Sequence, residues 1–148
     1  MEQSPARVTS LVLKRLTSSE VVKNWQPIAA FATASYSGPA ERRDAVLAEQ
    51  FAQIKDERQQ VWGVIVDGPK IAGIMVTAIR PCAVLELVSF WICTAIPDAL
   101  WPDALKSLDA WARENGCEWV QGITPVLGVA RLAERMGFEK GYLLRKAV

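Results

Sequence analysis

The sequence predicts one α/β domain with a mixed, mostly antiparallel central sheet flanked by helices. Three observations predict this fold class. The chain has 148 residues, so we expect a single domain over residues 1–148. Short apolar runs separated by turn residues fill residues 61–93, as is typical of paired strands. Helical spacing then alternates with short apolar runs, which indicates β-α units at the end of the chain.

The first third of the chain predicts a strand followed by helices. Residues 8–16 are apolar and rich in β-branched side chains, and they predict a strand. Residues 17–20, Thr-Ser-Ser-Glu, form a capping box, so a short helix is expected through Trp25. A loop at Gly38-Pro39 follows, and apolar residues then recur at helical spacing over residues 40–55.

The middle of the chain predicts three consecutive strands, over residues 61–66, 71–79 and 84–93. Asp67-Gly68 lies between the first two apolar runs and is a hairpin signal. Pro69 argues against a minimal two-residue turn at this point. The runs are almost continuously apolar, which favours strands that are covered on both faces.

The last third predicts two helices, over residues 102–115 and 126–136, and two strands, over 119–123 and 142–148. Proline is tolerated in a first helical turn, and glycine is common just after a helix; both signals bound these helices. Thr124 is expected to cap the second helix, with Pro125 at its first position. We expect the strand at 84–93 to lie beside the strand at 119–123.

Composition excludes several classes of protein. The net charge is +1 with both signs mixed along the chain, so no basic face for nucleic acid is expected. No run reaches the roughly 18 apolar residues of a membrane span, and no signal peptide is apparent, so we expect a cytoplasmic protein without membrane partners. The three tryptophans that fall on predicted strands, Trp62, Trp91 and Trp119, are expected in the core.

The chain contains no histidine, which excludes Ser-His-Asp and Cys-His catalysis and any zinc site built on histidine. No metal site is expected. The three cysteines, Cys82, Cys93 and Cys117, are an odd number without a Cys-x-x-Cys pair. They are expected to be free, buried thiols in a reducing compartment.

The order of predicted elements resembles the GNAT (GCN5-related N-acetyltransferase) superfamily. Residues 111–116, Trp-Ala-Arg-Glu-Asn-Gly, resemble the end of the GNAT helix that follows the acetyl-CoA loop. Residues 130–138, which end in Gly-Phe, resemble the last GNAT helix. The resemblance covers roughly residues 60–148 and implies a GNAT fold, with acetyl-CoA as the cofactor of an active member.

The cofactor loop departs from the GNAT pattern. GNAT enzymes carry an Arg-x-x-Gly-x-Gly/Ala loop, whose bare amides hold the pyrophosphate at a helix N-terminus. The corresponding residues 96–101 contain neither arginine nor glycine. Asp98 and Asp103 add negative charge, while Pro97 and Pro102 each remove an amide donor. No bound cofactor is therefore expected.

Two interpretations of function remain open. In the first, the chain is a non-catalytic structural or assembly component that binds a protein partner or a second copy. It resembles small GNAT-like proteins of tailed phages, which implies the host cytoplasm and the virion as locations. Leu100, Trp101 and Leu105 occupy the place that GNAT enzymes leave open for phosphate. They are expected either to anchor a partner or to fold inward and fill the groove.

In the second interpretation, the chain is an acyl-CoA-dependent N-acetyltransferase in which the substrate amine attacks the thioester directly. Glu86 is then the candidate general base. The backbone around Ile92, Ala99 and Leu100 would hold acetyl-CoA. The alternative for Glu86 is an ordinary position on the solvated face of its strand.

Overall fold

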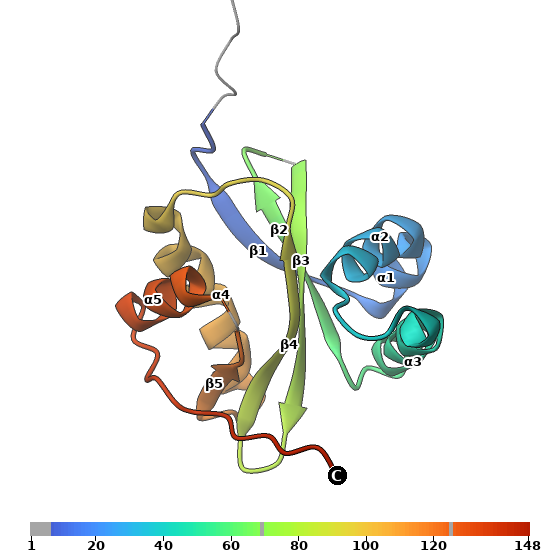
Figure 1. Ribbon diagram of the computed structural model, residues 1–148. Helices are drawn as coiled ribbons and strands as arrows, with labels where there is room; N and C mark the ends of the chain where they lie inside the picture. The colour runs from blue at the N-terminus through green and yellow to red at the C-terminus, as the bar shows by residue number, and fades with distance from the viewer. Residues whose placement is uncertain (1–6, 69, 125) are drawn as a thin grey trace, which may run out of the picture.

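The computed structural model describes residues 7–68, 70–124 and 126–148 (Figure 1). Within this part of the chain, five strands form one sheet in sequence order: β1 (Leu11–Leu16), β2 (Gln60–Val66), β3 (Lys70–Arg80), β4 (Val84–Ile92) and β5 (Trp119–Gly122). The first four strands pair in antiparallel fashion, and β5 runs parallel to β4. The predicted fold class is confirmed, as is the expected pairing of β4 with β5.

Helices cover both faces of the sheet (Figure 1). One side carries α1 (Ser18–Lys23), α2 (Trp25–Ser35) and α3 (Arg43–Lys55), and the other carries α4 (Trp101–Glu114) and α5 (Leu127–Arg135). Short 3₁₀ turns, Ala40–Arg42 and Asp98–Leu100, lead into α3 and α4. The crossover through α4 allows β5 to pair parallel to β4.

The N-terminal helices follow from local sequence signals. The capping box is confirmed, because Thr17 Oγ1 accepts from the amide of Glu20 at 3.1 Å, and Glu20 Oε1 accepts from the amide of Thr17 at 3.4 Å. The sequence reading ended this helical region at Trp25, but α2 begins there and continues to Ser35. Buried Ile28 and Ala32, four residues apart, give α2 the apolar face that holds it to the sheet.

Asp67 fixes the β2–β3 hairpin to the start of β1. Asp67 and Gly68 adopt φ angles of 47° and 104°, as a tight turn requires. Asp67 Oδ1 accepts from the amides of Thr9 at 2.8 Å and Ser10 at 2.9 Å. These hydrogen bonds, chiefly the one from the Thr9 amide, lower the pKa of Asp67. Pro69 lies outside the described residues.

Two cores lie on the two faces of the sheet. The larger joins the sheet to α4 and contains Leu13, Trp62, Val64, Met75, Leu85, Trp101, Ala104, Leu108, Ala112 and Cys117. The smaller joins the sheet to the N-terminal helices and contains Val21, Ile28, Ala32, Ile54, Val61, Ile74 and Val76. Because both faces of β2 and β3 are covered, these strands are apolar almost throughout.

The predicted strand over residues 142–148 is wrong. The segment is irregular backbone that pairs with no strand, and Tyr142 and Leu144 are 87% and 91% exposed. An apolar run becomes a strand only where a sheet edge receives its hydrogen bonds. In Figure 1 the chain leaves α5 and runs irregularly to the C-terminus.

Several finer predictions are also corrected. The last helix begins at Leu127 after Val126, and Thr124 Oγ1 accepts from the Val126 amide at 3.1 Å without serving as the cap residue. Pro125, predicted at its first position, lies outside the described residues. Trp91 and Trp119, both predicted in the core, are 38% and 60% exposed, and each lies near the end of a strand, Trp91 next to the last residue of β4 and Trp119 at the first residue of β5.

All three cysteines are free, as predicted, but only Cys117 is buried. Cys82 lies in the β3–β4 turn, and Cys93 follows the end of β4. The prediction of buried thiols is therefore wrong for these two, since both sit where the chain leaves the sheet. Among the helices of the described ranges, none is long and apolar enough to cross a membrane.

Candidate functional site

The β5 side of β4 becomes open where β5 ends at Gly122. Residues 84–87 of β4 pair with β5, and β4 then continues to Ile92 without it. At the same place the β3–β4 register shifts between Val76 and Thr77, which leaves Val88 as an extra residue on β4. A β-bulge of this kind bends a strand and changes the direction of its side chains. The opening beyond Leu87 is therefore the candidate site.

Glu86 lies in the closed part of the sheet, not in this opening. It sits between Ala78 of β3 and Gln121 of β5 in the register. Arg80 Nε donates to its Oε2 at 2.5 Å, and the Glu86 side chain is partly exposed. Glu86 lines neither of the two cavities described below. Its position is that of an ion-paired residue on a strand face.

The start of α4 presents few free amides. The amide of Leu100 donates to the carbonyl of Pro97 at 3.1 Å, and the amide of Trp101 donates to the carbonyl of Asp98. Pro102 has no amide hydrogen. A helix N-terminus binds phosphate through unpaired N–H groups that point at the anion. Three consecutive positions at this terminus supply none.

The charge at this terminus is also unfavourable for a pyrophosphate. Asp98 Oδ2 accepts from the Arg135 guanidinium at 2.7 Å, and Asp103 Oδ1 accepts from Lys106 Nζ at 2.7 Å. The hydrogen bond from Lys106, with its positive charge, lowers the pKa of Asp103 and raises that of Lys106. An incoming pyrophosphate would meet two carboxylates whose cations are already engaged. The residues present therefore do not fit the pyrophosphate of CoA.

Trp101 occupies the interior of the molecule. It is 6% exposed and belongs to the larger core, with its ring centroid 5.7 Å from that of Phe90 on β4. Ile92 and Leu105 pack against the same core, and Leu100 is half-buried. Ala99 is exposed in the turn before α4. The sequence left two outcomes for this segment: it anchors a partner, or it folds inward and fills the groove. The buried position of Trp101 is the inward one.

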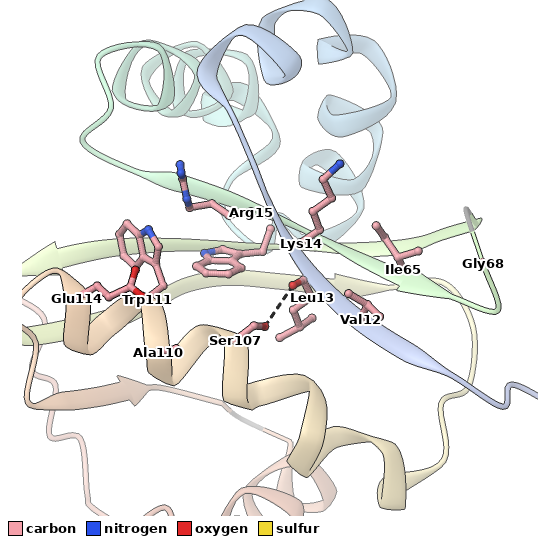
Figure 2. A pocket seen from close by; sticks show the side chains of 11 residues that line it. Val12, Leu13, Lys14, Arg15, Ile65, Gly68, Ser107, Ala110, Trp111 and Glu114 are labelled. Carbon is pink, nitrogen blue, oxygen red and sulfur yellow. Dashed lines mark hydrogen bonds between the residues drawn. The ribbon is translucent and has the colours of Figure 1, made fainter.

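A groove of about 590 Å³ lies between β1 and α4 (Figure 2), and β1 is the edge strand opposite β5 in the sheet. Ser107 Oγ donates to the Leu13 carbonyl at 3.2 Å across it. The Arg15 guanidinium lies 5.8 Å from the ring centroid of Trp111. These contacts connect the edge strand β1 to α4.

A second cavity, of about 330 Å³, lies between α2, α3 and the β4 bulge. We call it the α2–α3 pocket. Its lining residues are Ala32, Ser35, Tyr36, Ser37, Gly38, Val46, Leu47, Glu49, Gln50, Gln53, Gln59, Val88 and Ser89. Gln50 Nε2 donates to Ser89 Oγ at 3.5 Å, which connects α3 to the bulge.

Sequence reasoning assigned no role to any residue of this pocket. Gln50 and Gln53 are three residues apart and so share a helix face, which was the one available signal. Gln59 follows the helix end, and nothing in the sequence indicates that its side chain turns inward. No group of three or more His, Cys, Asp or Glu side chains that could hold a metal occurs among the residues that the structure describes.

No protein-family model and no curated protein matches the sequence. Solved structures do match. The chain shares 14% identity and a TM-score of 0.64 with the aminoglycoside N-acetyltransferase AAC(6')-Iy in complex with CoA, over 99% of this chain and 98% of that one. The aminoglycoside acetyltransferase meta-AAC0020, from an uncultured soil metagenomic sample and in complex with sisomicin, shares 12% identity and a TM-score of 0.66. The match covers 93% of this chain and 95% of that one.

A putative acetyltransferase from Pyrococcus furiosus matches with 9% identity and a TM-score of 0.62, over 94% of this chain and 99% of that chain. At these identities the likeness concerns the fold. The chain has the GNAT fold over nearly its whole length, as the sequence resemblance implied. The mismatch at the start of α4 is therefore a local change within a conventional GNAT architecture.

Proposed function

We propose that this chain is a non-catalytic GNAT-fold protein that acts as a binding or assembly component. The observation that carries the proposal is the start of α4. Its amides are paired or missing, two aspartates flank it, and Trp101 fills the space beside Phe90. An anion site needs the opposite arrangement, with several free donors and no competing carboxylates.

Exposed apolar residues support a protein partner or a second copy of the chain. Of the sixteen large apolar side chains that are exposed in the described residues, nine lie between Trp119 and the C-terminus. Exposed apolar residues mark an interaction surface where they form a contiguous patch, and this stretch of the chain supplies the residues for one. The segment around Leu100 and Leu105, predicted from the sequence, remains a second candidate surface. The sequence resemblance to tailed-phage proteins is the argument for a virion as the assembly.

Calorimetric titration with acetyl-CoA tests the proposal. We expect a dissociation constant of about 1 mM or weaker, equivalent to roughly −4 kcal/mol. The double variant Asp98→Ala/Asp103→Ala is the informative comparison, because it removes both carboxylates without adding a side-chain donor. A constant near 1 μM for the natural chain, about −8 kcal/mol, overturns the proposal.

An acyl-CoA-dependent N-acyltransferase is the second candidate function, and one observation favours it. The β4 bulge and the end of β5 at Gly122 leave one edge of β4 beyond Leu87 without a strand partner. Tight acetyl-CoA binding in the titration would select this candidate. Turnover of an amine substrate is then compared between the natural chain and Glu86→Gln, which tests Glu86 as the general base. Glu86 is expected to be essential only if its carboxylate leaves the ion pair with Arg80.

A further inference from the structure

The last part of the chain holds both a sheet edge and an apolar segment that have no partner within the described residues. β5 is the last strand of the sheet, so one of its edges pairs with β4 and the other pairs with no strand. Residues 142–148, which we call the tail, are irregular and make no backbone hydrogen bond to another described segment. A strand edge with free N–H and C=O groups is a template for a further strand.

The tail and β5 also expose large apolar side chains. Tyr142, Leu143 and Leu144 are exposed in the tail, and Trp119 is exposed on β5. Helix α5, which connects these two segments along the chain, contains no buried residue. Removing such apolar surface from water is favourable, so this end of the molecule is suited to association.

One antiparallel register matches the tail to the free edge of β5. The amide of Trp119 donates to the Ala83 carbonyl at 3.1 Å, so its backbone faces the start of β4 and that of Val120 faces the free edge. Val120 is half-buried against the larger core. Pairing Val120 with Leu143 places both side chains on that face, and Trp119 then lies opposite Leu144 on the other face.

The charges favour the same register. It places Glu118 opposite Arg145. Both residues are exposed, and neither takes part in an ion pair within the part of the chain that the structure describes. A shift of the tail by one residue would place Glu118 opposite Leu144, or Trp119 opposite Arg145. Complementary charges of this kind fix register and orientation more than they add affinity.

A second copy of the chain supplies both missing partners at once. In Figure 1 the tail extends past β5 and ends away from it, so the chain does not cover its own free edge. In a two-fold pair, each copy gives its tail and receives the other tail, and every contact therefore occurs twice. Such closed, isologous pairs are the commonest homo-oligomers, and exchange of an identical segment is a low-cost route to them.

We propose that two copies of this chain form a dimer by exchanging tails, and that each tail adds as an antiparallel strand to the free edge of the other copy's β5. Backbone hydrogen bonds along β5 hold the tail, and the two apolar pairs and the charge pair set its register. This inference rests on the proposed function, because it names the partner of a binding or assembly component.

Engineered cysteines test where each tail lies. Gln121 and Tyr142 are opposite each other in the proposed register, and Cα atoms of such cross-strand pairs lie at about 4.5–5.5 Å, within the range that a disulfide spans. Cys82→Ser and Cys93→Ser first remove the two exposed natural thiols. On oxidation, a mixture of the Gln121→Cys chain and the Tyr142→Cys chain should give a covalent dimer, as should the chain with both changes. A disulfide within one chain, or no disulfide, overturns the proposal.

Light scattering on a sizing column measures the mass of the natural chain, which we expect to be a dimer at about 50 μM. Leu144→Asp should weaken the dimer at least about tenfold, because the carboxylate would be buried against Trp119 without a partner. The matched control is Val12→Asp, which changes another exposed apolar residue, on the edge strand β1, and should leave the mass unchanged. A monomeric natural chain, or a dimer that Leu144→Asp leaves intact, overturns the exchange.

A charge reversal tests the register. Glu118→Arg and Arg145→Glu should each weaken the dimer, and the double variant should recover it, since the pair is then restored with its signs exchanged. No recovery in the double variant contradicts the proposed register. The acetyl-CoA titration is a separate readout: a tail-exchanged dimer that binds acetyl-CoA tightly overturns the proposed function alone, and a monomer that binds it weakly overturns the exchange alone.

Discussion

Replacing Trp101 by alanine should destabilise the protein strongly if this ring fills the space that GNAT enzymes leave for the cofactor. Trp101 is 94% buried, since 6% of it is exposed, and it contacts Phe90 edge to face. A tryptophan buries about 150–250 Å², which at about 25 cal/mol/Å² amounts to roughly 4–6 kcal/mol. The area estimate is an upper bound, and measured Trp→Ala losses are about 3–5 kcal/mol. We expect a loss in that range.

Urea unfolding, followed by circular dichroism, measures the difference in the free energy of unfolding. Trp119→Ala is the matched control, because Trp119 is 60% exposed and its removal should cost less than about 0.5 kcal/mol. A loss below about 1 kcal/mol for Trp101→Ala would refute the groove-filling role. Trp101 would then be free to act as a partner anchor, as the other interpretation of this segment holds.

Two further predictions concern backbone and pH. Ala83 in the β3–β4 turn has φ 61°, so Ala83→Gly should raise the free energy of unfolding by about 0.5–1 kcal/mol in urea titrations. The control Ala110→Gly, on the exposed face of α4, should lower the free energy of unfolding by about 1 kcal/mol. If Ala83→Gly also lowers the free energy of unfolding, the argument from the positive φ of Ala83 is contradicted. The pKa of Asp67 is lowered from 3.8, so its contribution to stability is present above that pH and lost as the pH falls through the folded pKa. Asp67→Asn should therefore be less stable than the natural chain near neutral pH, with the difference shrinking in acid unfolding below 3.8. A difference that is the same at every pH would contradict this.

Local signals in the sequence predicted most of the elements correctly. The capping box at Thr17 and Glu20 placed a helix start, and apolar runs placed β2, β3 and β4 within a residue or two. Such signals succeed because capping, turn chemistry and side-chain periodicity act between residues that are close along the chain. Helix α2 was missed although its buried residues, Ile28 and Ala32, have the i, i+4 spacing of a helix.

Part of the site could also be predicted. The prolines and aspartates between residues 96 and 103 predict a poor pyrophosphate site, and the structure places paired amides and ion pairs at the start of α4. Weak binding of CoA stays a prediction. The sequence left two positions open for Trp101, inside or on the surface. It offered two roles for Glu86 as well, and nothing local could choose between them.

The sequence by itself determined the fold class and the order of β2, β3, β4, α4, β5 and α5, because these depend on residue identity and short spacing. Only the tertiary structure decided that Trp101 packs on Phe90, that Arg80 pairs with Glu86, and that residues 142–148 find no strand edge. It also brought Gln50 of α3 within hydrogen-bond distance of Ser89 on β4. These outcomes depend on which distant surfaces meet, and that is set by packing of the whole chain, not by any local pattern.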